Sequence, residues 1–165
     1  MDAVDTFALW LRSTSISEFI RVYPWGWPAA ETLHFIGLSM LIGCAGMFDL
    51  RLLGFMPKVP IKAVHDLLFW AKVGFALNLV TGIVFFVGAP DQYIRNTAWW
   101  GKVLFLVIAG ANAFLFETKF GRQVADIKVG EETPVPFKVA AGVSLVSWFF
   151  VTYWGRMLPF IGNAF

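Results

Sequence analysis

Residues 28–53 read PAAETLHFIGLSMLIGCAGMFDLRLL, and this stretch decides the fold. It begins at a proline, is apolar for most of its length and carries charged residues only near its two ends. A membrane-spanning helix needs about 20 such residues to cross roughly 30 Å of hydrocarbon. Three further stretches have the same character, at residues 64–89, 97–118 and 135–159. The sequence therefore predicts an all-α fold, a polytopic membrane four-helix bundle.

Prolines separate these four stretches. Before the first of them, Val4, Phe7, Ala8 and Leu11 recur near helical spacing with polar residues between them. We therefore expect one amphipathic helix over about residues 3–22, lying in the membrane interface. All eight prolines lie at or outside the ends of the stretches, where a missing backbone N–H is tolerated: Pro24, Pro28, Pro57, Pro60, Pro90, Pro134, Pro136 and Pro159.

Composition indicates a single membrane domain over residues 1–165. Mean hydropathy is +0.69 and aromatic residues make up 18% of the chain, which is too apolar for a soluble domain of this length. The net charge of +2 forms no basic stripe, so we expect the lipid bilayer as a partner and no nucleic acid. Cys44 is the only cysteine, which excludes a disulfide within the chain and a cysteine-rich metal site.

Basic residues are divided unequally between the two ends of the predicted bundle. Seven lie in the first and third loops with their helix ends, and five lie on the other side. Because cytoplasmic loops carry an excess of Lys and Arg, this predicts that both termini lie outside the cytoplasm. The N-terminal residues lack the positive flank and apolar core of a cleaved signal, so we expect them to remain in the mature protein.

Four ionisable side chains interrupt or border the apolar stretches on one predicted side of the membrane: Glu31, His34, Lys102 and Arg156. An ionisable group at the centre of a bilayer costs about 3 kcal/mol on insertion scales, so a cluster at one depth predicts a functional site. His34 shares a helical face with Glu31 and is expected to face inward. Two uses of its imidazole stay open: a hydrogen bond to Glu31 or another helix, and ligation of a metal or haem.

Lys102 and Arg156 lie at the same depth in the membrane as His34 if the helices are antiparallel. One interpretation is anchoring, because both long side chains can extend to the interface. The other is that the two cations bind an anionic group beside the imidazole, such as haem propionates or a carboxylate substrate, through charge-assisted hydrogen bonds. The residues themselves leave both interpretations open.

His65 opens the second stretch at the opposite membrane face, about 20 Å from His34 along the membrane normal. The two histidines are therefore not expected to ligate one haem within a single chain. His65 is either an ordinary interfacial residue or a metal ligand of a second site, near Asp49, Arg51 and Asp66 or in a partner chain.

Other polar residues also lie in the apolar stretches. Asn78 and Asn112 are expected to bond across helices, which is worth about 1 kcal/mol or less in a membrane. Lys72 has three options, which are pairing with Asp49, pairing with Glu117 and extension to the interface. Small residues suit close packing within the bundle or across a homo-oligomer or larger membrane complex. Met40 and Met47 share a helical face, which suits either a core position or copper.

The segment Glu31-Thr-Leu-His34-Phe-Ile-Gly37 and the following Phe48-Asp49-Leu50-Arg51-Leu52-Leu53-Gly54 resemble the first helix of an uncharacterised family of small bacterial four-helix integral membrane proteins. Agreement continues at Thr81-Gly82, at residues 96–102 and 109–112, and at Gly155-Arg156, which together cover most of the chain. The resemblance implies a multi-pass protein of the bacterial inner (cytoplasmic) membrane, and the charge asymmetry then predicts periplasmic termini. It implies a family but no function.

A more distant similarity is to the membrane haem-containing protoporphyrinogen oxidases and to copper-resistance D-type proteins. In these oxidases a histidine in the first helix and a lysine at the start of a later helix are functional, and His34 and Lys102 stand at matching places. The similarity implies a haem b site. The aromatic and proline residues that precede the arginine in the oxidases are replaced here by Phe48-Asp49-Leu50-Arg51, which argues against porphyrinogen oxidation.

The expected function is therefore that of a haem b-binding inner-membrane protein in electron transfer, with a quinone as electron partner. His34 is the expected axial ligand, Glu31 its orienting partner, and Lys102 and Arg156 the residues that face the propionates. Two alternatives remain: a non-catalytic membrane subunit or anchor of a larger complex, and a transporter of copper or a small solute. No nucleophile and base arrangement or phosphate loop is visible in the sequence, which disfavours hydrolase and kinase chemistry.

Overall fold

The structure is a computed structural model that describes residues 2–161. Four of its helices are long and apolar enough to cross a membrane, and the part described contains no strand, which confirms the predicted fold class. The seven helices in this range are α1 (Ala3–Arg12), α2 (Ser15–Val22), α3 (Gly26–Leu53), α4 (Ile61–Gly88), α5 (Pro90–Ile94), α6 (Thr97–Val124) and α7 (Val135–Met157).

The long helices begin and end close to the predicted bounds, with one clear exception. α6 continues to Val124 rather than ending at residue 118. Charged residues begin at Glu117, near the predicted end, but a helix can continue past the hydrocarbon into water. At 28 residues and 1.5 Å per residue, α6 is about 42 Å long and exceeds the roughly 30 Å apolar layer.

The N-terminal segment forms two helices, so the single helix predicted over residues 3–22 is wrong in number. α1 ends where the Ser13 hydroxyl donates to the Trp10 carbonyl at 2.7 Å. α2 begins where the Thr14 hydroxyl oxygen accepts from the Ser17 N–H at 3.3 Å. Such side chains compete with backbone hydrogen bonds and end helices locally, which apolar spacing alone does not reveal.

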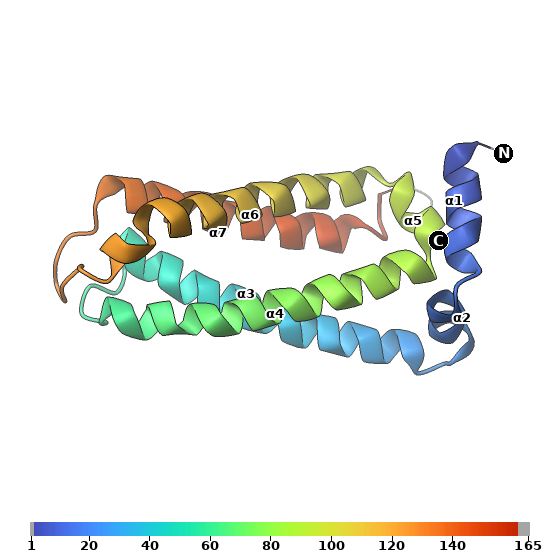
Figure 1. The fold of residues 1–165 in the computed structure, drawn as a ribbon, viewed down its shortest axis with the longest axis horizontal. Helices are drawn as coiled ribbons and strands as arrows, with labels where there is room; N and C mark the ends of the chain where they lie inside the picture. The colour runs from blue at the N-terminus through green and yellow to red at the C-terminus, as the bar shows by residue number, and fades with distance from the viewer. Residues whose placement is uncertain (1, 162–165) are drawn as a thin grey trace.

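α1 lies across one end of the bundle, crosswise to the long helices (Figure 1). Arg95, which follows α5, binds Asp2 at 2.8 Å and Asp5 at 2.9 Å, and Arg12 pairs with Asp91 of α5. These exposed pairs each contribute little on their own, but together they fix the direction of α1. Exposed aromatic side chains on α1 and α2 fit the predicted place in the membrane interface.

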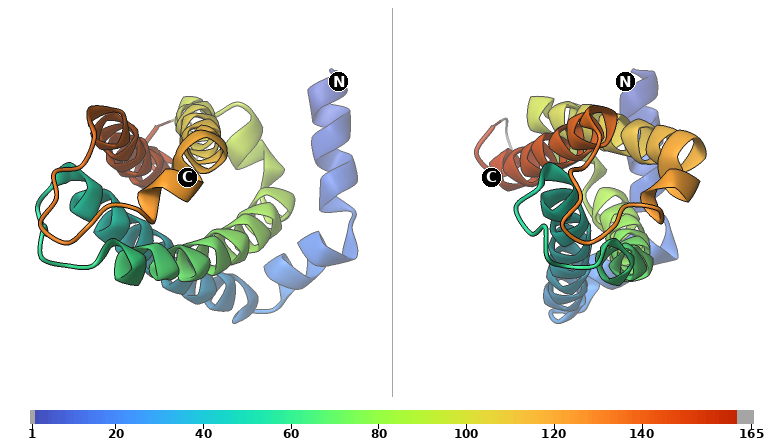
Figure 2. Two further views of the ribbon diagram at one scale, coloured as in Figure 1. Left: turned by 60° about the vertical axis from the view of Figure 1, so that its left-hand side comes forward. Right: turned by 90° about the vertical axis from the view of Figure 1, so that its left-hand side faces the viewer.

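The four long helices form two pairs. α3 packs closely on α4, α6 packs on α7, and the pairs meet mainly along α3 and α7, so that α4 and α6 make little contact (Figure 2). At the α3–α4 crossing the backbones touch, because a Cβ added at Gly74 would lie 2.6 Å from the Gly37 carbonyl oxygen. Near the loop end the pairs share one buried cluster: Phe48, Leu52, Ile61, Val64, Phe116, Val124, Ile127, Phe137 and Ala141.

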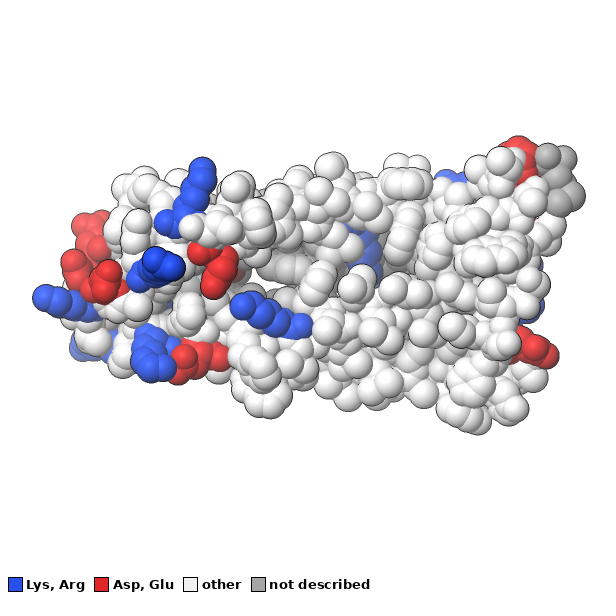
Figure 3. Space-filling view, viewed as in Figure 1, with Lys and Arg blue, Asp and Glu red and all other residues white. Residues whose placement is uncertain are grey.

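Charged side chains gather toward the two ends of the molecule, and the middle is mainly uncharged (Figure 3). The same view shows the surface hollowed between α6 and α4, with a basic side chain inside the hollow. This hollow follows from the pairing of the helices, since α4 and α6 are the two long helices that stay apart.

Candidate functional site

His34 lies on α3, half-buried, and its ring contacts α4. Its Nδ1 is 2.8 Å from the Oγ1 of Thr81, a side chain with only 4% exposure. The Thr81 hydroxyl donates its hydrogen to the Leu77 carbonyl at 2.8 Å, so its oxygen accepts from His34. Nδ1 therefore carries the ring proton, and Nε2 keeps its lone pair.

We predict that Thr81→Val changes the tautomer of His34, whereas Thr81→Ser keeps it. Valine removes the acceptor of the Nδ1–H bond, and a hydrogen bond of this kind is worth about 0.5–1.5 kcal/mol, or roughly two- to tenfold in the tautomer ratio. The measurement is the ¹⁵N spectrum of histidine-labelled protein, which is simple because the chain has two histidines. An unchanged His34 signal in Thr81→Val would contradict the assignment.

Lys102 and Trp154 bring two unpaired donors to the same half of the bundle. Lys102 of α6 lies beside Gly155 of α7, where an added Cβ would be 3.6 Å from Nζ, and Trp154 packs against Gly101. The Trp154 indole Nε1 is buried without a hydrogen-bond partner in the part of the chain described. Over residues 2–161, Lys102 likewise makes no hydrogen bond or ion pair, and its charge acts on the His34 imidazole.

We call His34, Thr81, Lys102 and Trp154 the His34 site. It offers one imidazole lone pair and two N–H donors without acceptors, all within membrane-spanning helices. A buried donor without an acceptor is costly, at about 1–3 kcal/mol. The arrangement therefore suits a ligand that accepts hydrogen bonds or carries negative charge.

Two of the residues predicted for this site are exposed and contact other side chains. Glu31 is exposed and accepts from the Trp27 indole at 3.2 Å, one turn earlier on the same face, so the predicted bond between Glu31 and His34 is not made. Burial raises the pKa of Tyr93 to about 12, and the negative charge of Glu31 adds to the rise, which places Glu31 near α5. Arg156 is exposed, with its guanidinium 5.0 Å from the centroid of the Phe160 ring.

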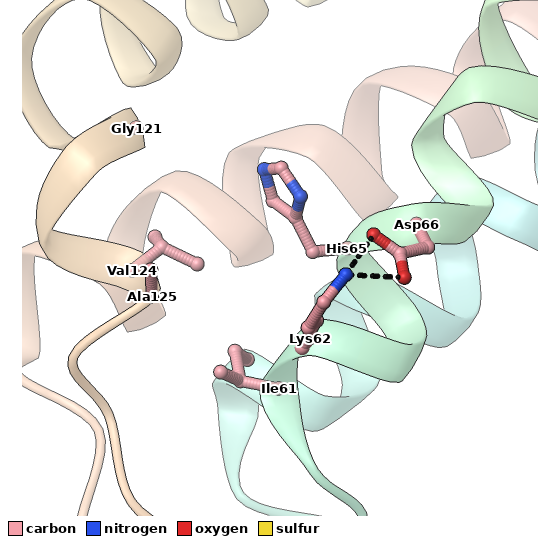
Figure 4. Close-up of a pocket in the computed structure, with 7 residues that line it drawn as sticks. All are labelled: Ile61, Lys62, His65, Asp66, Gly121, Val124 and Ala125. Atoms are coloured by element: carbon pink, nitrogen blue, oxygen red, sulfur yellow. Dashed lines mark hydrogen bonds and ion pairs between the residues drawn. The ribbon is translucent and has the colours of Figure 1, made fainter.

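His65 lines a separate cavity of about 230 Å³ between α4 and α6 (Figure 4). Its ring lies edge-on to Phe48, with centroids 5.9 Å apart. Both Asp66 oxygens accept from Lys62, at 3.1 and 2.9 Å, so that carboxylate is already paired. Residues 2–161 contain no group of three or more His, Cys, Asp or Glu side chains that could hold a metal ion.

Two of the neighbours predicted for His65, Arg51 and Asp49, do not line its cavity. Arg51 is fully buried, and its Nε donates to the Val59 carbonyl at 2.7 Å, which fastens the loop between α3 and α4. Asp49 lines a different cavity. Met40 lies in the α3–α4 contact, beside Gly74, while Met47 is 41% exposed, so the two do not converge on one point.

That second cavity has a volume of about 390 Å³ and lies between α3, α4, α6 and α7. Its polar lining residues come from all four helices: Asp49, Lys72, Asn112, Glu117 and Ser144. The sequence reveals most of these residues one at a time, as polar interruptions of apolar stretches. It does not reveal that they share a cavity, because that depends on how each helix is rotated about its axis.

A family of unknown function, DUF6644, matches residues 13–161 of the chain. The match covers all four membrane-spanning helices. The protein belongs to this family. No curated protein and no solved structure matches the chain. Membership of DUF6644 confirms the predicted place in an uncharacterised family of membrane proteins.

In this DUF6644 protein the two polar regions differ in chemistry. The His34 site presents donors without acceptors, on the half of the bundle near the termini. The 390 Å³ cavity contains two carboxylates and lies on the other half, toward the α3–α4 and α6–α7 loops. The two regions therefore suit ligands of opposite character.

Proposed function

We propose that this DUF6644 protein binds haem b within the membrane, with His34 as an axial ligand, and takes part in electron transfer. A membrane quinone is the proposed electron partner. The observation that supports this most directly is the hydrogen bond between His34 Nδ1 and Thr81, which leaves the Nε2 lone pair for a metal. Histidines that ligate metals usually donate their other ring N–H in this way.

The remaining residues of the His34 site suit the rest of a haem. Its propionates need donors, and Lys102 and the Trp154 Nε1 lack acceptors in the part of the chain described. Thr81 takes the orienting role that the sequence suggested for Glu31. Bound haem supplies a one-electron carrier whose potential depends on its axial ligands and burial.

The proposal includes the membrane in which the protein lies and the side on which its termini lie. The excess of basic residues in the loops at the end opposite the termini supports an inner-membrane protein with periplasmic termini. The His34 site would then lie in the periplasmic half of the bilayer. A partner on that side could exchange electrons with it.

The test is a reduced-minus-oxidised absorption spectrum of the purified protein, combined with a pyridine haemochrome assay. The expected result is a b-type spectrum with haem bound in a fixed ratio to the chain. Protein expressed with added haem that shows no such spectrum would exclude the proposal. The assay needs no substrate and no partner protein.

A second candidate is a non-catalytic membrane subunit, favoured by small residues that nothing covers. Side chains added at Gly43 of α3 and Gly110 of α6 would meet nothing within 4 Å. Small residues on an exposed helix surface suit close approach of a further helix. Without haem, the His34 site would then be a polar contact within such an assembly.

A further inference from the structure

The 390 Å³ cavity contains a buried acceptor that nothing in the described chain satisfies. Asp49 is 5% exposed, and its Oδ2 has no hydrogen-bond partner within residues 2–161. Ser144 of α7 lines the same cavity close to this carboxyl group. A buried carboxylate oxygen without a partner is costly, so Asp49 is a position where a ligand donor would be strongly favoured.

The other polar lining groups carry both acceptors and donors, and the lining as a whole has an excess of carboxylates over cations. The Asn112 Nδ2 donates a hydrogen bond to the Ala140 carbonyl at 3.0 Å, which leaves its amide oxygen available as an acceptor. Glu117 adds a second carboxylate from α6. Lys72 is the one cation among the lining residues described, and it forms no ion pair with either carboxylate there. The lining therefore carries two carboxylates against one cation.

The rest of the lining is apolar and aromatic, including Phe48, Phe75 and Trp148. The volume lies in the range of small-molecule pockets, roughly 300–1,000 Å³. The hollow between α6 and α4 in Figure 3 faces the lipid, so a lipid-soluble molecule could enter from the bilayer. A ligand for this cavity should combine an apolar body with a donating, positively charged group.

We infer that the cavity binds a lipophilic organic cation, a protonated amine on an apolar body. The ammonium group donates to Asp49 Oδ2, and the apolar body packs among the aromatic side chains. An ammonium near the face of Trp148 gains further cation–π attraction. This site is independent of the proposed haem, which concerns the other half of the bundle.

The test compares ligands of one size by isothermal titration calorimetry on the protein in lipid nanodiscs. The probes are 2-phenylethylammonium and its neutral analogue 2-phenylethanol, with empty nanodiscs subtracted. The charged hydrogen bond should make the ammonium bind at least about tenfold more tightly than the alcohol. Equal affinities, or tighter binding of the anion 3-phenylpropionate, would overturn the inference.

Two variants locate the site. Asp49→Asn is expected to weaken ammonium binding about tenfold or more and to leave binding of the alcohol unchanged. The matched control is Asp66→Asn, since the Asp66 carboxylate is held by Lys62 outside this cavity, and it should bind like the parent. An unchanged ammonium affinity in Asp49→Asn would also overturn the inference. If Asp49→Asn does not fold, the comparison of the ammonium with the alcohol on the unaltered protein tests the inference.

Discussion

Replacing His34 by alanine is expected to abolish haem binding, whereas replacing His65 by alanine leaves it intact. His34 carries a ring nitrogen with a free lone pair, fixed by the bond from Nδ1 to Thr81. An alanine supplies no ligand, so the iron loses its protein anchor at that position. The measurement is the haem-to-protein ratio by pyridine haemochrome, on variants purified in parallel.

The His65 variant is the matched control because His65 lines the 230 Å³ cavity, at the other end of α4 from Thr81. Equal loss of haem in both variants, or equal retention, would remove His34 from the proposed role. The haem content of Thr81→Val should lie between those of the two alanine variants. Losing the hydrogen-bond partner of a metal-binding histidine typically costs about 10–100-fold in affinity. If Thr81→Val binds haem with the parental affinity, the tautomer fixed by Thr81 does not control how His34 ligates the iron.

The second large effect is on stability: Gly74→Ala is expected to destabilise the protein by about 2–3 kcal/mol. An alanine Cβ there would lie 2.6 Å from the Gly37 carbonyl oxygen and 2.7 Å from the Leu41 backbone nitrogen. Both neighbours are backbone atoms of α3, so no rotamer change relieves the clash and the two helices must separate. Thermal unfolding in detergent, followed by circular dichroism, measures the loss.

Gly82→Ala provides the control on the same helix. A Cβ at Gly82 would meet nothing within 4 Å, so the change should be within about 0.5 kcal/mol of neutral. Gly43→Ala is the corresponding control on α3, and its stability should also stay within about 0.5 kcal/mol of the parent. If Gly74→Ala and Gly82→Ala unfold at the same temperature, the close contact of α3 and α4 is not what stabilises this pair.

The membrane-spanning helices could be predicted because their signal is local. Each is long and apolar enough by itself, and Pro60 and Pro134 lie directly before α4 and α7. The break between α1 and α2 was missed because it depends on two hydroxyl groups, Ser13 and Thr14, within a stretch of continuous amphipathic spacing. A Ser-Thr pair was the one signal that could have found it.

The candidate site was predictable only in part. Depth in the membrane follows from position along a helix, and this groups His34 with Lys102, which is close enough to act on the imidazole electrostatically. The partner of His34 was not predictable, because Thr81 reads as an ordinary small residue in an apolar stretch. Trp154 is not among the residues that the sequence predicts for the site, although its indole nitrogen is buried without a partner in the part of the chain described.

The sequence by itself determined that this protein is a four-helix membrane domain and at what depth its ionisable residues lie. Those properties depend on hydropathy and on the 1.5 Å rise per residue, which are fixed along one helix. Only the tertiary structure decided which residues meet. The close contact at Gly37 and Gly74 sets the rotation of α3 against α4, and this rotation brings His34 to Thr81. Separation of α4 from α6 then leaves room for the cavity at Asp49, since contacts between helices depend on rotation and not on depth.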